Sequence, residues 1–166
     1  EQEAMQYIAS LDPVLTENLP QPENRPGVEI IRVSDIDSYF LKKYLSERKI
    51  PLELARKYCR QITTFNPEQG KRYTILGFEN NAGGYALRAP GTYKATNRAG
   101  ITTINIDGER DVMRSSGSVA VFEGFFDYLS WLVMQSTDRP SCDVVVLNSV
   151  NNLDKDVAYI GHHASI

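Results

Sequence analysis

The chain has 166 residues, of which 42% are hydrophobic and 23% charged, and its net charge is −3. This composition is typical of a soluble globular protein. No apolar run approaches the ~18 residues that a membrane-spanning helix needs, and the first ten residues lack the basic and apolar regions of a signal peptide. The two cysteines, Cys59 and Cys142, form no CxxC pair, which favours reduced thiols in a cytoplasmic protein over a zinc ribbon within this chain. Because the chain does not begin with Met, we expect it to be cut from a longer protein.

Charge is unevenly distributed along the chain. Residues 42–60 carry 7 basic and 2 acidic side chains, whereas residues 117–166 carry 2 basic and 6 acidic ones. A basic middle followed by an acidic end can combine a phosphate-binding surface with a metal-binding surface. For residues 42–60 an ordinary solvated helix face is the alternative.

Residues 1–33 are predicted to form an N-terminal segment and a linker, since residues 12–27 contain four prolines. Ser34 and Asp35 can cap a helix through residue 49, with Ile36, Phe40 and Tyr44 on one face. Pro51 suits the first turn of a second helix. The exposed face of this helical hairpin is predicted to bind nucleic acid through Lys42, Lys43, Arg48, Lys49, Arg56 and Lys57.

Strand signals follow the two helices. Residues 60–65 are rich in β-formers, and residues 71–80 and 85–90 flank Asn-Ala-Gly-Gly, which indicates a β-hairpin. Residues 100–107 alternate in the manner of another strand, and residues 108–117 form a connection. Residues 34–116 are therefore expected to form an α+β lobe.

The last fifty residues change in character. A buried-type strand at 118–123 is followed by an amphipathic helix at 125–136 and a second apolar strand at 142–148. Leu153, Val157 and Ile160 mark a second helix, and residues 164–166 suit the start of a third strand. This βαβα order predicts a parallel sheet with right-handed crossovers, so residues 117–166 are assigned to a separate α/β domain and the chain as a whole to the α/β class.

Glu123 stands out within this pattern. Parallel α/β sheets bind ligands at the carboxyl ends of their strands, and Glu123 occupies such an end, directly before Gly124. A carboxylate there can coordinate Mg²⁺ or act as a general base. Asp127 lies in the first turn of the following helix, where it is either a companion of Glu123 or simply a residue that stabilises the helix N-terminus.

The segment VAVFEGFFDYLSW resembles the first motif of toprim domains, a hydrophobic strand followed by E-G-x-x-D and a helix. The later VVVLNSVNNL resembles the second toprim strand and the turn after it. Upstream, YLSERKI is similar to a segment that precedes the catalytic core of bacterial primases, with Lys49 where that pattern has glycine, and GFENNAGGYALRAP resembles the primase hairpin before the toprim domain. The chain thus looks like a primase-like protein that ends within its toprim domain.

This resemblance implies catalytic and Mg²⁺-binding roles for Glu123 and Asp127. Toprim domains complete the metal site with an Asp-x-Asp pair after their third strand, so the fragment is expected to be inactive alone. Asn148 and Ser149 end the second strand and are candidates for nucleotide binding, with helix capping as the alternative. Arg88 and Lys94 join the six hairpin cations as candidate nucleic-acid contacts.

The predicted function is Mg²⁺-dependent nucleotidyl transfer on a single-stranded DNA template, in the replication or mobilisation of a mobile element. The expected partners are single-stranded DNA and nucleotides, with a replicative helicase as a further candidate and no membrane. Two alternatives stay open. One is a toprim nuclease that uses the same acids, and the other is a non-catalytic module that binds single-stranded DNA or a helicase.

Overall fold

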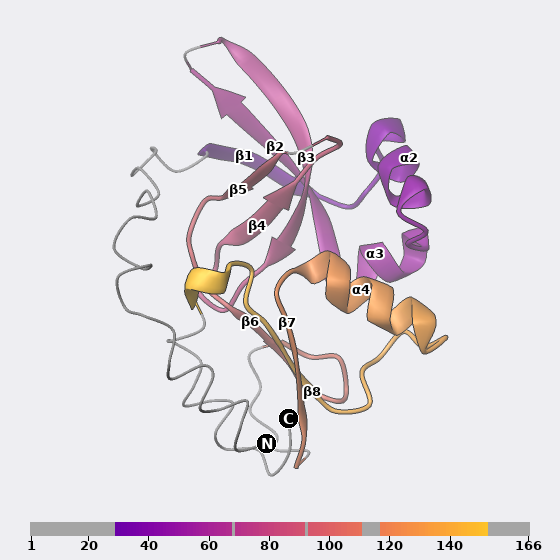
Figure 1. Ribbon diagram of the computed structural model, residues 1–166. Helices are drawn as coiled ribbons and strands as arrows, with labels where there is room; N and C mark the ends of the chain where they lie inside the picture. The colour runs from indigo at the N-terminus through magenta and orange to yellow at the C-terminus, as the bar shows by residue number, and fades with distance from the viewer. Residues whose placement is uncertain (1–28, 68, 92, 111–116, 153–166) are drawn as a thin grey trace, which may run out of the picture.

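The computed structural model describes residues 29–67, 69–91, 93–110 and 117–152, and these residues form a mixed α+β fold with two sheets (Figure 1). One sheet has five strands and the other has three. No helix within the described residues has the length and apolar character that crossing a bilayer requires.

The five-stranded sheet is antiparallel throughout, in the order β1-β2-β3-β4-β5. The predicted hairpin is confirmed, because β3 and β4 pair across the turn at residues 80–84. Asn80 closes that turn, since its Oδ1 accepts hydrogen bonds from the backbone N–H groups of Ala82 and Gly84. The strands are β1 (Glu29–Ser34), β2 (Cys59–Asn66), β3 (Lys71–Glu79), β4 (Tyr85–Arg88) and β5 (Lys94–Thr96).

The first strand corrects the predicted linker at its C-terminal end. Residues 29–33 were assigned to the linker, but they belong to β1, which pairs antiparallel with β2. The sequence signal was weak because β1 is an edge strand, mostly exposed, with an irregular register between Ile30 and Arg32. An edge strand that is exposed on both faces shows little of the alternation that identifies strands.

Two helices connect β1 to β2: α2 (Tyr39–Glu47) and α3 (Leu52–Tyr58). The predicted hairpin is confirmed, but α2 begins later than expected. The side-chain Oε1 of Gln61 accepts hydrogen bonds from the backbone N–H groups of Asp37 and Ser38, so the chain before Tyr39 is held by β2. The predicted apolar face is confirmed for Tyr44, which is buried, and is wrong for Phe40, which is 74% exposed. Ile36 is buried but precedes the helix.

The three-stranded sheet contains the parallel pair that the sequence predicts. Strands β7 (Val119–Phe122) and β8 (Asp143–Val146) are parallel and are joined through α4 (Phe125–Met134). On the other side of β8 lies the antiparallel strand β6 (Thr102–Ile104), although residues 100–107 were expected to belong to the preceding lobe. A short 3-10 helix, η2 (Val150–Asn152), follows β8. The predicted helix at 153–160 and strand at 164–166 lie outside the described residues.

The two sheets share one hydrophobic core, because helix α4 packs against elements of the N-terminal half. The Phe125 ring is stacked on Phe78 of β3 with centroids 5.2 Å apart, and the Tyr128 ring meets Tyr58 of α3 edge to face at 5.2 Å. All four rings are at most 2% exposed. This packing holds the start of α4 against the five-stranded sheet.

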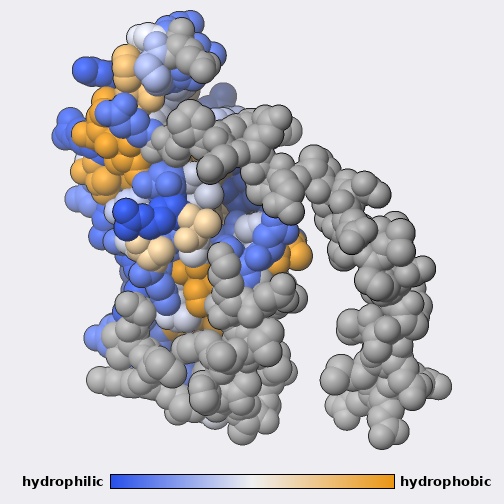
Figure 2. All heavy atoms as spheres, turned by 90° about the vertical axis from the view of Figure 1, so that its left-hand side faces the viewer, coloured by the Kyte–Doolittle hydropathy of each residue, from blue (hydrophilic) through white to orange (hydrophobic). Residues whose placement is uncertain are grey.

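The other face of the five-stranded sheet carries a smaller cluster of Ile62, Ile75 and Leu87, all nearly fully buried. Figure 2 views the molecule from the side away from α2 and α3. It shows apolar residues gathered in the upper part, at the level of this sheet, with hydrophilic residues around them.

Candidate functional site

Glu123 follows β7 directly, at the carboxyl end of the strand, and its side chain is 62% exposed. Gly124 has extended backbone and precedes the first turn of α4. The Asp127 carboxylate reaches back to this turn, because its Oδ2 accepts a hydrogen bond of 3.0 Å from the Gly124 N–H. Asp127 therefore caps α4 and holds the turn that follows Glu123, as the helix-stabilising alternative predicted.

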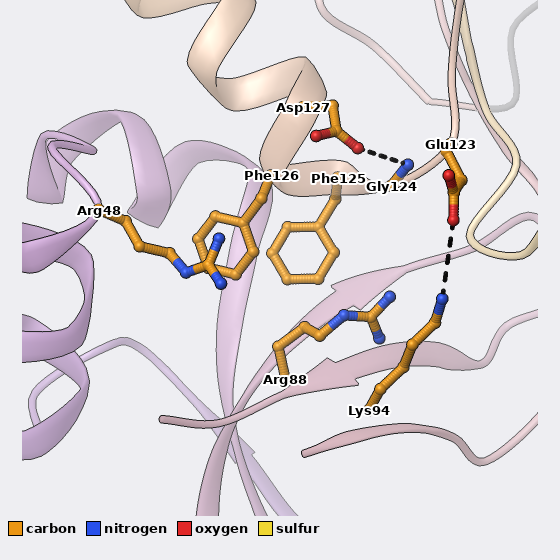
Figure 3. A pocket seen from close by; sticks show the side chains of 8 residues that line it. All are labelled: Arg48, Arg88, Lys94, Glu123, Gly124, Phe125, Phe126 and Asp127. Carbon is orange, nitrogen blue, oxygen red and sulfur yellow. Dashed lines mark hydrogen bonds and ion pairs between the residues drawn. The ribbon is translucent and has the colours of Figure 1, made fainter. Parts of the chain in front are cut away.

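The two carboxylates lie at an open pocket of about 210 Å³. One side of this pocket comes from the turn after β7 and the start of α4, and the other comes from the end of α2 and from β4 and β5 (Figure 3). Its lining residues are Arg48, Arg88, Lys94, Glu123, Gly124, Phe125, Phe126 and Asp127. Three of the eight predicted nucleic-acid contacts thus meet the two predicted metal ligands.

Aromatic rings support the two guanidinium groups of the pocket. The Arg48 guanidinium carbon is 4.3 Å from the centroid of the Phe126 ring, and that of Arg88 is 5.8 Å from the Phe125 ring. The two rings are themselves stacked at 4.6 Å and are at most 9% exposed. Such contacts attract a cation to the ring face and restrict its motion, so both guanidinium groups are preorganised.

Positive charge exceeds negative charge in the pocket. Lys94 Nζ lies 3.9 Å from Glu123 Oε1, but both side chains are more than half exposed, so this ion pair is weak. Within the described residues, Arg48 and Arg88 form no ion pair. Burial lowers the pKa of Arg88, and the Arg48 charge acts in the same direction, whereas Tyr44, Asp127 and Glu123 oppose the shift. A partly buried cation beside another cation favours binding of an anion.

The other predicted cations have different surroundings. Arg56 donates hydrogen bonds to the Ile36 carbonyl oxygen and to Glu53, and Lys57 donates to the Asp138 backbone and carboxylate oxygens. These two residues connect α3 to neighbouring segments. Lys42 and Lys43 lie on α2 and do not line the pocket.

Lys49 adopts φ = 60°, in the left-handed region, just after α2 ends. A β-carbon makes this conformation unfavourable, and glycine adopts it most easily. The glycine of the primase pattern would meet the same requirement. Position 49 thus has a backbone conformation that glycine adopts more easily than lysine, and Lys49 does not line the pocket.

Asn148 and Ser149 do not line the pocket. The Asn148 side-chain Nδ2 donates hydrogen bonds to the Gly100 carbonyl oxygen and to Thr102 Oγ1, each 3.1 Å long, and so joins the end of β8 to the start of β6. The Ser149 carbonyl oxygen accepts a hydrogen bond from the Asn152 N–H within η2. In the described residues, both positions contribute to local structure.

The carboxylates at the pocket suit a magnesium ion that binds together with a phosphate ligand. No group of three or more His, Cys, Asp or Glu side chains gathers among the described residues. Mg²⁺ is commonly held by one or two carboxylates together with substrate phosphates and water. Glu123 and Asp127 meet that smaller requirement, and the adjacent cations can bind the phosphates.

The sequence did not predict the aromatic support of the pocket, because Phe125 and Phe126 were expected only as part of the amphipathic helix at 125–136. Two aromatic residues directly after Glu-Gly were the available signal. Their role depends on Arg48 and Arg88, which are far away in sequence and approach them only in the fold.

A family model described as "Domain of unknown function (DUF8464)" matches residues 30–97. The matched stretch contains α2, α3 and all of the five-stranded sheet except Glu29, and it supplies the three pocket cations, Arg48, Arg88 and Lys94. It ends before β6 and includes neither Glu123 nor Asp127. No curated protein and no solved structure matches the chain significantly.

Proposed function

We propose that this pocket binds the phosphate groups of nucleotides and single-stranded DNA, and that the chain is part of a primase-like nucleotidyltransferase. One observation carries the proposal. Three cations from the end of α2 and from β4 and β5, Arg48, Arg88 and Lys94, line the same pocket as Glu123 at the carboxyl end of β7. A carboxylate opposed by excess positive charge is a suitable arrangement for a metal–phosphate ligand.

The chain's own residues provide binding and orientation. Arg88 and Lys94 would hold phosphate oxygens by charge-assisted hydrogen bonds, and Arg48, stacked on Phe126, would add a further donor of fixed orientation. Helix α4 begins at the pocket, and its N-terminus favours an anion there. Glu123 and Asp127 would hold Mg²⁺, which supplies charge neutralisation at the phosphate and activation of a 3′-hydroxyl.

A non-catalytic module that binds single-stranded DNA is the second candidate. It is favoured by the Asp127 carboxylate, which caps α4, and by the small number of carboxylates gathered in the described residues. The phosphate pocket would serve such a module equally well without metal. The nuclease alternative uses the same acids and differs only in its product.

The test separates metal-assisted phosphate binding from simple charge attraction. Calorimetric titration of the chain with ATP, with and without Mg²⁺, is compared for wild type and Glu123→Gln. We expect Mg²⁺ to strengthen ATP binding by about tenfold in wild type, a gain of about 1.4 kcal/mol, and to have no effect in the variant. Glu47→Gln, which removes another exposed carboxylate on α2, should behave as wild type.

The same Mg²⁺ effect in wild type and Glu123→Gln would show that Glu123 does not bind the metal, and the non-catalytic binding module would then be the remaining candidate. Absence of ATP binding in both would remove the phosphate pocket altogether. In the full-length protein, incorporation of labelled nucleotides on a single-stranded template indicates a primase, and cleavage of that template indicates a nuclease.

A further inference from the structure

Two large aromatic side chains are exposed side by side at the start of α2. Tyr39 is 73% exposed and Phe40 is 74% exposed, and their rings meet edge to face with centroids 5.9 Å apart. Single exposed apolar residues are common on protein surfaces, but two adjacent aromatic rings with most of their area in water are typical of a binding surface.

The fold fixes both rings outwards. The Gln61 side chain holds the backbone just before the helix, at Asp37 and Ser38. Beyond the aromatic pair, Leu41, Tyr44 and Leu45 bury the opposite face of α2 in the core. With one face of the helix buried, Tyr39 and Phe40 remain on the solvent side.

Positive charge lies beside the aromatic pair. Lys42 and Lys43 follow Tyr39 and Phe40 by three residues each, so they are neighbours on the helix surface. Lys43 Nζ is 3.9 Å from Glu47 Oε1, an exposed pair that is weak enough to be exchanged for phosphate. Two exposed acidic residues, Asp35 and Asp37, precede the rings in the chain, whereas the lysines follow them on the helix. The positive charge therefore lies on the side of the rings toward the rest of α2.

Helix α2 leads from the aromatic pair to the pocket. It ends at Glu47, and Arg48, the next residue, lines the pocket. At 1.5 Å per residue, Phe40 and Arg48 are separated by about 12 Å along the axis, roughly three to four nucleotides at the rise of a stacked strand. A single strand can therefore contact both places at once.

We propose that Tyr39 and Phe40 form a stacking platform for the bases of a single-stranded nucleic acid, whose phosphates pass Lys42 and Lys43 and reach the pocket at Arg48. The inference rests on the proposed function, because the pocket receives the phosphates of the same strand. Stacking on aromatic rings suits any base, so the platform holds the strand without selecting its sequence.

The experiment compares a thymidine oligonucleotide of about twelve residues with an abasic strand of the same length, by fluorescence anisotropy. Wild type should bind the thymidine strand at least about tenfold more tightly than the abasic strand. Tyr39→Ala/Phe40→Ala should bind the thymidine strand about 10- to 100-fold more weakly and lose the preference, with the same salt dependence, because no phosphate contact is removed. Tyr39→Phe/Phe40→Tyr keeps two aromatic rings and should therefore retain the preference for the thymidine strand.

Met134→Ala is the matched control, since Met134 is 80% exposed at the end of α4 and should leave both affinities unchanged. Equal affinity of wild type for the two strands would overturn the platform and leave the phosphate pocket intact. A base preference that persists in Tyr39→Ala/Phe40→Ala would also overturn it. If wild type binds neither strand, the proposed function fails as well, and a protein partner becomes the interpretation of the aromatic pair.

Discussion

Helix α3 and strands β4 and β5 each present cations that the sequence identified as candidate nucleic-acid contacts, yet the two regions use them differently. On α3, Arg56 is bonded to the carbonyl oxygen of Ile36, and Lys57 is bonded to Asp138. On β4 and β5, Arg88 and Lys94 face the pocket and its carboxylates. The cations of α3 therefore join separate segments of the fold. Arg88 donates instead to the carbonyl oxygen of the adjacent Leu87, and Lys94 pairs weakly with the exposed Glu123, so both can still meet a ligand.

The comparison shows that local charge density is a poor guide to a binding cation. Arg48, Arg56 and Lys57 all belong to the most basic stretch of the chain, residues 42–60, but of these three only Arg48 lines the pocket. Arg88 and Lys94 line it from segments without a run of charge. The useful property is what the charged group contacts in the fold. A cation bonded to a distant segment of the chain stabilises the fold, whereas one held by a neighbouring residue or by a weak exposed pair can still attract an anion.

The largest effect is expected at the pocket. Arg88→Gln/Lys94→Gln should weaken binding of a single-stranded oligonucleotide by about 100-fold, since a hydrogen bond to a charged group contributes about 1.5–3 kcal/mol. The slope of log K against log salt should fall by about 1.4, the value for two lost phosphate contacts on a single strand. Anisotropy titrations at several salt concentrations measure both quantities.

Arg56→Gln/Lys57→Gln removes the same charge from α3 and is the matched control. We expect its oligonucleotide affinity to remain within about twofold of wild type, apart from a small long-range charge effect. A loss as large as that of the pocket variant would break the distinction between the two groups of cations.

A smaller effect is expected on stability, and in the other region. Arg56→Ala should lower the free energy of unfolding by about 1–2 kcal/mol, because the Ile36 carbonyl oxygen loses its two guanidinium hydrogen bonds. Urea denaturation followed by circular dichroism measures the change. Lys43→Ala, on an exposed surface pair, should change it by less than about 0.5 kcal/mol. Equal values for the two variants would show that the Arg56 contact adds nothing.

The smallest effect concerns the pH dependence of the Lys57–Asp138 pair. The hydrogen bond from Lys57 lowers the pKa of the Asp138 carboxyl below its ordinary value of 3.8, and the charges of Lys57 and Arg139 act in the same direction. A carboxyl whose pKa is lowered in the folded state stabilises the fold above its ordinary pKa. That contribution is lost as the pH falls through the lowered value.

Wild type should therefore exceed Asp138→Asn in urea midpoint at about pH 6, and the difference should disappear as the pH falls through the lowered pKa of Asp138. The difference should be slight, because the Asp138 side chain is 69% exposed and the pair is screened by solvent. A difference that persists at the acid end would assign the effect of the substitution to something other than ionisation.

Patterns of neighbouring residues predicted much of the fold. The apolar runs before and after α4 predicted two parallel strands, and β7 and β8 are parallel. The turn at residues 80–84 predicted the hairpin of β3 and β4. Glu123 was located at the end of β7 from the same local signals. The start of α2, by contrast, depended on Gln61, a residue of a later strand, and was misplaced.

The sequence by itself determined where the apolar strands and the amphipathic helix lie, because hydrophobic periodicity and turn residues act over a few neighbouring positions. Only the tertiary structure decided which cations meet Glu123, that β6 pairs with β8, and that Asn148 bonds to β6 instead of facing the pocket. These outcomes depend on contacts between residues tens of positions apart, which result from packing two sheets around one core. No local pattern of residues carries that information.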